Sequence, residues 1–240
     1  MEDGFVLDGI RFIVTTGSSG RASGPDGVVL LKPWDFVRQE YEVLASHPPR
    51  RLLEIGVFEG GGAVLWPRLL DLSRYVGLDR RDLSQLRFPS AVERDPRWTA
   101  VRFVGGASQA DPAAVETAMS MLDGPPDAVI DDASHQYELS KRTFELCFPR
   151  VAPGGVYIIE DWNWAHSDGP WSSKGHPWHG APSLANLVLR VVLLAAERRD
   201  LVSRVDVRPN FVAVWRGPTL IEGAWALDPT ISRRRLKEII

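Results

Sequence analysis

The sequence has one cysteine, Cys147, among its 240 residues. A single cysteine excludes a disulfide within the chain and a cysteine-rich metal site. No apolar run reaches the roughly 18 residues that a membrane-spanning helix needs. Residues 1–20 also lack the basic segment followed by an apolar segment that marks a secretory signal. We therefore expect a cytoplasmic protein with no membrane partner.

The sequence also lacks a strong excess of charge of one sign. The formal net charge is −3, whereas a nucleic-acid partner usually requires a basic face, so we expect none. The chain is 44% hydrophobic and 25% charged, which suits one globular domain with a sizeable core, or a domain plus an extension. These values favour a small-molecule substrate and leave a homo-oligomer open.

From residue 51 onward, short apolar runs alternate with helical patterns. The predicted strands are residues 51–57, 75–79, 101–105, 127–132, 155–161, 202–208 and 211–216, and the predicted helices are 62–74, 112–121, 137–147 and 183–199. The first five strands are apolar and end near glycine or an acid, which is typical of a parallel sheet buried on both faces. The last two are separated only by Pro209 and Asn210, which is hairpin spacing. The order predicts an α/β fold: a Rossmann-like, doubly wound, seven-stranded sheet, mostly parallel with a C-terminal antiparallel hairpin.

Residues 1–48 have a different character. Residues 17–27 are rich in glycine and serine, which predicts a mobile stretch, and residues 34–46 predict a helix. We interpret 1–48 as an N-terminal extension that could cover the site as a substrate lid, and 49–240 as the cofactor-binding domain. Within that domain, Pro67 should kink or shorten the helix over 62–74.

The strongest local motif is Leu-Glu-Ile-Gly-Val-Phe-Glu-Gly-Gly-Gly at residues 53–62, where a strand gives way to a helix. Gly56 and Gly60 allow a ligand to approach the backbone, and the helix N-terminus offers free N–H groups. The spacing is G-x-x-x-G, whereas a dinucleotide fingerprint is G-x-G-x-x-G. Glu54 would repel a pyrophosphate but suits the ammonium and sulfonium groups of S-adenosylmethionine.

The ends of the next two predicted strands supply further cofactor candidates. Asp79 ends the second strand, and an acid at this place can accept both ribose hydroxyls. Ser108 and Gln109 follow the third strand and could meet the adenine edge. Three strand ends that offer suitable groups in order indicate an S-adenosylmethionine site.

Two acidic pairs close the fourth and fifth predicted strands: Asp131-Asp132 and Glu160-Asp161. Because neighbouring strands lie about 4.8 Å apart, these carboxylates would repel one another without a counter-charge. Oxygen ligands of this kind suit Mg²⁺, or Ca²⁺ or Mn²⁺ in its place. Successive strand residues point to opposite faces, so not all four can be ligands unless the chain turns. The alternative is that the acids cap helices or pair with arginines.

His135 follows Asp132 by three residues. A neutral imidazole with an ordinary pKa near 6.5 is a suitable base for a hydroxyl at neutral pH. The alternative is a histidine that merely caps a helix start.

Four segments together resemble a known family: LEIGVFEGGG, GLD, DDASH and VAPGGVYIIEDW. They are similar to class I S-adenosylmethionine-dependent O-methyltransferases, and in particular to the metal-dependent macrolide-sugar O-methyltransferases and the rhamnosyl O-methyltransferase and cephalosporin hydroxylase-like group. The resemblance covers roughly residues 51–161. It implies a metal held by Asp132, Glu160 and Asp161, with Asp131 on the cofactor side and His135 as the general base.

Four tryptophans fall within the stretch that follows the last acidic pair: Trp162, Trp164, Trp171 and Trp178. His166, His176 and His179 share this stretch, but their spacing matches no common zinc set. Glycine and proline surround these residues, which is typical of a loop. We expect a mobile recognition loop over residues 162–182 that stacks on a sugar or an aromatic substrate and orders when substrate binds.

The favoured function is divalent-metal-dependent O-methylation of a small natural product, with the sugar of a glycosylated secondary metabolite as the favoured acceptor. A catechol-type or other small-molecule O-methyltransferase is the nearest alternative. An NAD(P)-dependent Rossmann oxidoreductase is another, although the chain lacks G-x-G-x-x-G and Tyr-x-x-x-Lys. A third is a cofactor-binding partner subunit without activity.

Overall fold

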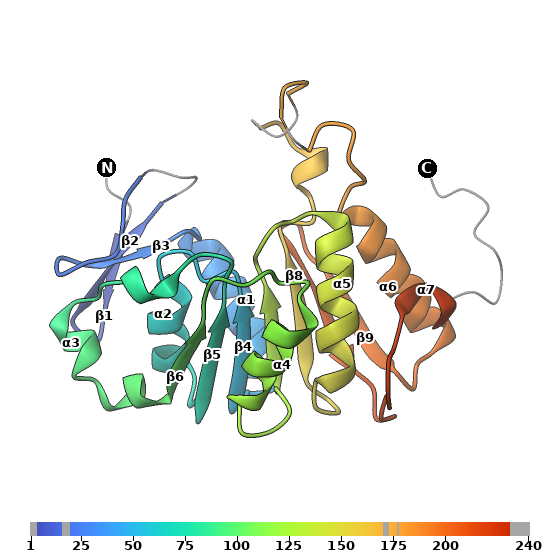
Figure 1. Cartoon of the computed structure of the whole chain (residues 1–240), viewed down its shortest axis with the longest axis horizontal. Coiled ribbons are helices and arrows are strands. Elements are labelled where there is room, and N and C mark those ends of the chain that lie inside the picture. Colours follow the sequence, from blue (N-terminus) through green and yellow to red (C-terminus); the bar gives the residue numbers. More distant parts are fainter. Residues whose placement is uncertain (1–3, 16–19, 170–172, 177, 231–240) are drawn as a thin grey trace.

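The computed structural model describes residues 4–15, 20–169, 173–176 and 178–230. Figure 1 shows a central sheet covered by helices, with a second, smaller sheet near the N-terminus. The strands of the central sheet are β4 (Arg51–Ile55), β5 (Arg74–Leu78), β6 (Val101–Val104), β7 (Ala128–Asp131), β8 (Val156–Glu160), β9 (Val202–Val207) and β10 (Phe211–Arg216). The helices are α1 (Trp34–Ser46), α2 (Gly61–Leu69), α3 (Ser90–Glu93), α4 (Pro112–Ser120), α5 (Tyr137–Cys147), α6 (Ala185–Glu197) and α7 (Leu227–Thr230). The described residues also form the 3₁₀ turns η1 (Leu83–Gln85), η2 (Pro96–Ala100), η3 (Phe148–Arg150) and η4 (Trp164–His166).

The strands of the central sheet follow the order β6-β5-β4-β7-β8-β10-β9. The first five are parallel, while β10 runs antiparallel to both β8 and β9. This confirms the predicted fold class, including the C-terminal hairpin. The strand order reverses between β4 and β7, and in open α/β sheets ligands bind outside the carboxyl ends of the strands at such a switch point.

Helix α2 is shorter than the predicted helix over residues 62–74. Pro67 lies in its last turn, and the helix ends at Leu69. Proline has no N–H to donate and its ring crowds the preceding turn, which accounts for the early end. The prediction that Pro67 would kink or shorten this helix is confirmed.

The N-terminal residues form a three-stranded sheet that the sequence reading did not predict. Its strands are β1 (Gly4–Leu7), β2 (Ile10–Val14) and β3 (Val28–Leu30), in the order β1-β2-β3. Phe12 and Val28 are fully buried, and they share one apolar cluster with α1, α2 and β4. The segment is therefore packed into the core on one face of the central sheet. Residues 16–19 of the glycine- and serine-rich stretch lie outside the described residues.

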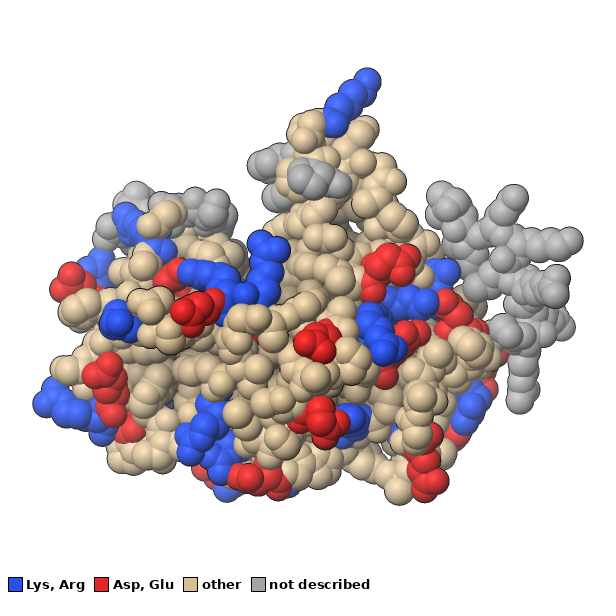
Figure 2. Space-filling model, viewed as in Figure 1, with Lys and Arg blue, Asp and Glu red and all other residues tan. Residues whose placement is uncertain are grey.

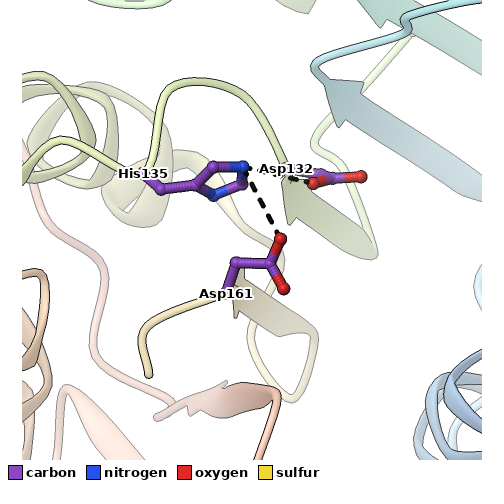
Figure 3. A group of neighbouring side chains, drawn as sticks. All are labelled: Asp132, His135 and Asp161. Atoms are coloured by element: carbon purple, nitrogen blue, oxygen red, sulfur yellow. Dashed lines mark ion pairs between the residues drawn. The ribbon is translucent and has the colours of Figure 1, made fainter. Parts of the chain in front are cut away.

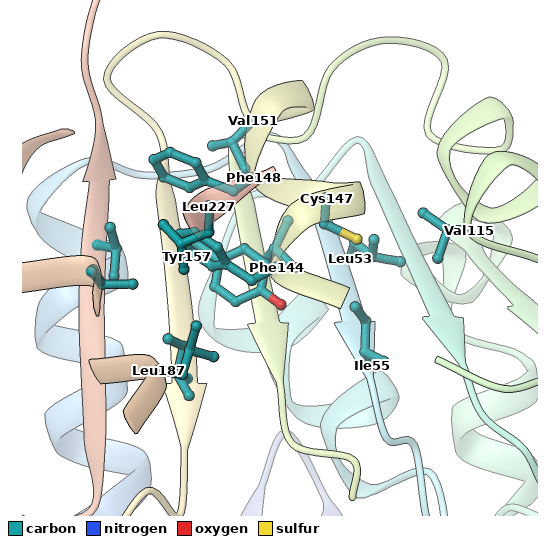
Figure 4. Packing of buried hydrophobic residues seen from close by; sticks show 14 of the residues in the cluster. Leu53, Ile55, Val115, Phe144, Cys147, Phe148, Val151, Tyr157, Leu187 and Leu227 are labelled. Carbon is teal, nitrogen blue, oxygen red and sulfur yellow. The ribbon is translucent and has the colours of Figure 1, made fainter. Parts of the chain in front are cut away.

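The other face of the sheet is covered by α4, α5 and α6 (Figure 1). Figure 4 shows the packing there, where Phe144 of α5 lies against Tyr157 of β8 and near Leu187 of α6. With helices on both faces, the inner strands β4, β5, β7, β8 and β10 are almost wholly buried, whereas the edge strands β6 and β9 are partly exposed.

The surface charge bears on whether the protein could bind a charged partner, and the lengths of the helices bear on whether it could span a membrane. On the face shown in Figure 2, acidic and basic side chains alternate, and neither sign gathers into a large patch. Among the described residues, no helix combines the length and the apolar character needed to span a membrane.

Candidate active site at the carboxyl edge of the sheet

The glycine-rich loop after β4 depends on glycine for its shape. Gly56 has φ +94°, and a Cβ there would overlap the backbone carbonyl oxygen of Asp132 at the end of β7. Gly60 has φ +81°, and a Cβ there would lie 2.6 Å from the Phe88 ring. Both positions combine the left-handed conformation with a close approach, which only glycine accepts without strain. The loop consequently lies directly against the end of β7 at the switch point.

Asp79, the predicted ribose ligand, lies beside this loop. Its Oδ2 accepts hydrogen bonds from the backbone N–H groups of Val57, at 2.8 Å, and Phe58, at 2.9 Å. Its Oδ1 accepts one from the N–H of Arg81 at 2.8 Å. Asp79 thus fixes the loop to the end of β5, and its contact with a ribose stays a prediction.

Glu54 lies beneath the start of α2. It is buried, accepts a hydrogen bond from the Tyr75 hydroxyl, and approaches Gly62 so closely that a Cβ there would overlap its carboxylate. Burial raises the pKa of Glu54 to about 7. The acid is therefore poised between its charged and neutral forms near neutral pH.

The remaining predicted cofactor residues have different surroundings. Ser108 is exposed at the same edge of the sheet. Gln109 is buried and donates to Asp131 at 3.3 Å and to Thr143 at 3.0 Å, while the Tyr157 hydroxyl donates to Asp131 at 3.1 Å. Gln109 and Asp131 thus hold the end of β7 against α5. Contact between any of these three residues and the cofactor stays a prediction.

Asp132, His135 and Asp161 converge beyond the ends of β7 and β8, as Figure 3 shows. The Nε2 atom of His135 lies 3.8 Å from Oδ1 of Asp132 and 3.7 Å from Oδ2 of Asp161. One potential ligand atom from each residue lies within 4.8 Å of the others, and among the described residues this is the one such group that could hold a metal ion. The two strand ends that the sequence placed together do meet here.

Burial sets the protonation states in this group. It lowers the pKa of His135, although the negative charge of Asp132 opposes the shift, and the lowered pKa favours the neutral imidazole. Burial and the charge of Asp132 raise the pKa of Asp161 to about 8. A neutral imidazole is able to take up a proton, and a cation between Asp132 and Asp161 would favour the charged form of Asp161.

Glu160 does not join this group. Its side chain is buried, and Oε1 pairs with the Nζ of Lys32, which also lies 3.4 Å from Glu40 and 3.4 Å from Asp132. Glu160 is the last residue of β8, and Asp161 follows it with a left-handed φ of +54°, so the Glu160 side chain pairs with Lys32 while that of Asp161 lies near His135. The sequence reading missed Lys32 and Glu40. The one feature of the sequence that could have drawn attention to Lys32 is its place directly after the apolar run Val28–Leu31.

The tryptophan-rich segment after β8 rises above this edge of the sheet (Figure 1). The ring of Trp164 lies 4.4 Å from the His135 ring and 5.6 Å from that of Trp178, measured between centroids. Trp164 also hydrogen-bonds the Asp161 carboxylate. At the base of the segment, the Trp162 indole donates to the Arg208 carbonyl at 2.8 Å. Trp164 and Trp178 thus form an aromatic wall beside His135, while Trp171 lies outside the described residues.

Residues 53–162, which include this loop and this group, match a family model described as a methyltransferase domain. The match covers a little under half of the chain, and it makes these residues similar to a methyltransferase domain on a Rossmann-like fold. The chain is 36% identical to demethylmacrocin O-methyltransferase of Streptomyces fradiae over 118 residues, which is 46% of this chain and 27% of that protein. It is 29% identical to mycinamicin VI 2''-O-methyltransferase of Micromonospora griseorubida over 169 residues, which is 68% of this chain and 39% of that protein. The predicted resemblance to macrolide-sugar O-methyltransferases is confirmed.

Solved structures give the same picture of the fold. The chain is similar to the MycE methyltransferase of the mycinamycin pathway in complex with Mg, SAH and mycinamycin VI, with a TM-score of 0.58 and 24% identity over 77% of this chain and 50% of that one. It also resembles an O-methyltransferase of Bacillus cereus in complex with SAH, with a TM-score of 0.54 and 20% identity over 77% of this chain and 81% of that one. The chain spans half of MycE and less than half of the curated relatives that it matches.

Proposed function

We propose that this chain is an S-adenosylmethionine-dependent, divalent-metal-dependent O-methyltransferase that acts on a hydroxyl of a small natural product, with a sugar as the favoured acceptor. The observation that carries the proposal is the convergence of His135 with Asp132 and Asp161 next to a glycine-rich loop at the switch point of the sheet. A base, a cation site and a nucleoside site on neighbouring strand ends are the parts that metal-assisted methyl transfer to oxygen requires.

The cofactor site would consist of the loop after β4 and the strand ends beside it. Gly56 and Gly60 leave the loop backbone accessible, Asp79 would bind the ribose, and Glu54 would attract the ammonium group of the cofactor. Ser108, Gln109 and Asp131 complete the proposed set. Both MycE and the Bacillus cereus O-methyltransferase were solved with SAH, which supports this cofactor over a nicotinamide dinucleotide.

A divalent cation fits the residues that are present. Asp132 and Asp161 supply oxygen ligands, and the resemblance adds Glu160, whose Oε2 is buried without a hydrogen-bond partner among the described residues. Oxygen donors select Mg²⁺, Ca²⁺ or Mn²⁺ over softer-ligand metals, and MycE was solved with Mg. When bound, such an ion would lower the pKa of an acceptor hydroxyl.

The protein's own residues would then move the proton and hold the acceptor. His135 receives the hydroxyl proton at Nε2, which faces the two carboxylates, and its burial keeps the imidazole neutral before the transfer. S-adenosylmethionine supplies the electrophilic methyl group. The Trp164 and Trp178 rings would stack on the apolar face of a sugar and limit the access of water.

The acceptor distinguishes this proposal from a catechol-type O-methyltransferase. Two of the matched relatives are named for a rhamnosyl tetracenomycin and an olivosyl-oleandolide acceptor, which supports a sugar. The test is to incubate the protein with methyl-labelled S-adenosylmethionine, Mg²⁺ and two panels, one of deoxysugar glycosides and one of catechols. We expect label in the glycosides, no label after exhaustive chelation, and recovery on adding Mg²⁺. Full activity after chelation would contradict the metal role, and label in the catechols alone would contradict the sugar.

A further inference from the structure

Ser23 joins the N-terminal segment to the glycine-rich loop of the proposed cofactor site. It lies shortly before β3, outside the residues 53–162 that match the methyltransferase model. Its Oγ donates to the backbone carbonyl of Glu59 at 2.7 Å, and its N–H donates to the Glu59 carboxylate at 3.2 Å. Both residues are buried. A serine that is distant in sequence therefore holds both the backbone and the side chain of one loop residue.

A tight turn brings Ser23 to this position. Gly24 and Gly27 exchange two backbone hydrogen bonds, at 2.9 and 3.2 Å, and the turn between them returns the chain to β3. The N–H of Val29 in β3 then donates to the Ser23 Oγ at 2.8 Å. The carbonyl of Val29 also approaches Gly61 at the start of α2, where a Cβ would lie 2.5 Å from the carbonyl oxygen. The Ser23 hydroxyl thus accepts from β3 and donates to the loop, and β3 lies directly against the helix that the loop begins.

The loop needs such support because its backbone is strained. Phe58, the residue before Glu59, has φ +50°, and a non-glycine residue persists in this left-handed region only where its surroundings fix it. On one side, Asp79 accepts a hydrogen bond from the Phe58 N–H at 2.9 Å. On the other side, Ser23 holds one oxygen of the Glu59 carboxylate, while Arg81 pairs with the second at 2.7 Å. The shape of the loop therefore depends on the N-terminal segment as well as on the end of β5.

We propose that Ser23 is a positioning residue for the cofactor: it holds the glycine-rich loop in the shape that binds S-adenosylmethionine, and the bound cofactor in turn holds the N-terminal segment in place. This rests on the proposed function and deepens it, because it names a residue outside the matched domain on which cofactor affinity depends. A loop that adopts its binding shape only part of the time lowers the apparent affinity by that fraction. Thermodynamic linkage makes the effect reciprocal, so bound cofactor stabilises the contact between Ser23 and the loop.

Titration calorimetry with SAH tests the effect of Ser23 on the cofactor site. Ser23→Ala removes the hydroxyl, and we expect it to bind SAH about five-fold more weakly than the wild type, the equivalent of one net hydrogen bond. Ser23→Thr keeps the hydroxyl and should recover most of the affinity. The matched control is Ser46→Ala, because the Ser46 hydroxyl donates to the Val43 carbonyl at 2.7 Å at the C-terminal end of α1. It should bind SAH like the wild type. A Ser23→Ala variant that melts at a lower temperature but binds SAH with unchanged affinity would overturn the proposal.

Amide hydrogen exchange at Val29, followed by nuclear magnetic resonance, tests the reciprocal effect. In the wild type, we expect saturating SAH to slow exchange of the Val29 N–H by about ten-fold or more, because opening its contact with Ser23 would require the ligand to leave. In Ser23→Ala, SAH should leave this exchange nearly unchanged. Equal slowing in both proteins would reflect global stabilisation alone and would overturn the proposal, as would an absence of slowing in the wild type.

The outcomes separate this inference from the proposed function. If the wild type and Ser23→Ala bind SAH equally well, the role of Ser23 fails and the proposed cofactor site stands. If the wild type does not bind SAH, the proposed cofactor site fails and the role of Ser23 fails with it. If Ser23→Ala does not fold, Ser23→Cys takes its place with the same expectations, because a thiol is a weaker hydrogen-bond donor than a hydroxyl.

Discussion

At the scale of single residues, the site uses backbone conformations that most side chains avoid. Phe58, His135 and Asp161 have φ values of +50°, +53° and +54°. Non-glycine residues in this left-handed region are uncommon and cost free energy, and they cluster at functional sites. Two of these three residues are the base and a carboxylate of the proposed centre, so local strain is used to turn both side chains toward one point.

His135→Ala should remove the proposed base and leave the rest of the site in place. We expect kcat for methyl transfer to fall by about 10²–10⁴-fold, which is the usual contribution of a general base. Cofactor affinity should change little, because His135 faces the carboxylates and the tryptophan wall. Labelled-methyl assays and calorimetry measure the two quantities. The matched control is His47→Ala, because His47 lies far from the site in sequence and is exposed at the end of α1. An unchanged kcat would contradict the role of His135.

Glu54→Gln should change how stability depends on pH. The pKa of Glu54 is raised by burial to about 7 from an ordinary value of 4.5, so the folded protein holds a proton that the unfolded chain releases. That stability is fully present below pH 4.5 and is lost as pH rises toward 7. Because the variant lacks this titration, its free energy of unfolding relative to the wild type should rise by about 1.4 kcal/mol per pH unit across the window. Urea unfolding at pH 5 and pH 7 measures the difference, and a difference that does not vary with pH would contradict the shift.

At the scale of elements, strand ends were the most predictable part of the molecule. The acids and glycines that end β4, β5, β7 and β8 are visible in the sequence because buried parallel strands are short apolar runs with sharp ends. Those same ends carry Asp79, Asp132 and Asp161. The small N-terminal sheet was not predicted, since β1 is only half-buried and β3 has three residues. The packing of this sheet against α2 depends on contacts between residues that are distant in sequence.

The direction of Glu160 could not be read from the sequence for a related reason. A strand pattern predicts that Glu160 and Asp161 point to opposite faces, but Asp161 lies beyond the end of β8 with φ +54°, and the pattern does not tell which of the two meets Asp132. The answer depends on what lies on each face, and Lys32 and Glu40 come from a segment more than a hundred residues earlier. Likewise, Gln109 is buried with Asp131 and Thr143 because α5 packs there, which no local pattern reveals.

The tryptophan-rich segment between β8 and α6 should change its accessibility when substrate binds. Lys174 is exposed within it, so trypsin should cut after Lys174 in the free protein. Stacking of the acceptor on Trp164 and Trp178 should order the segment and slow this cut severalfold, because loops that close on substrate open less often once it is bound. Mass spectrometry of the tryptic fragments measures the rate of this cut in the free protein and in the presence of cofactor and a methylated acceptor. Lys174→Ala identifies the cut, and equal rates in both states would contradict the proposed closure.

At the scale of the whole molecule, the site draws on more than the matched methyltransferase residues. The N-terminal segment contributes Lys32 to the acidic group and fastens the cofactor loop through Ser23 and Glu59. Helices cover both faces of the inner strands, and because ligands of open α/β sheets bind at the carboxyl edge beside the switch point, we expect the cofactor there. The position of the site thus follows from topology, and its chemistry follows from the residues that topology brings to that edge.

The central claim is that this edge binds S-adenosylmethionine, and titration calorimetry with S-adenosylmethionine and with NAD tests it most directly. We predict micromolar binding of S-adenosylmethionine and little binding of NAD, because the G-x-x-x-G loop and Glu54 disfavour a pyrophosphate. Asp79→Ala should weaken S-adenosylmethionine binding by about 1–3 kcal/mol, the cost of leaving buried ribose hydroxyls unpaired. Equal or tighter binding of NAD, or an Asp79→Ala variant with unchanged affinity, would contradict the account.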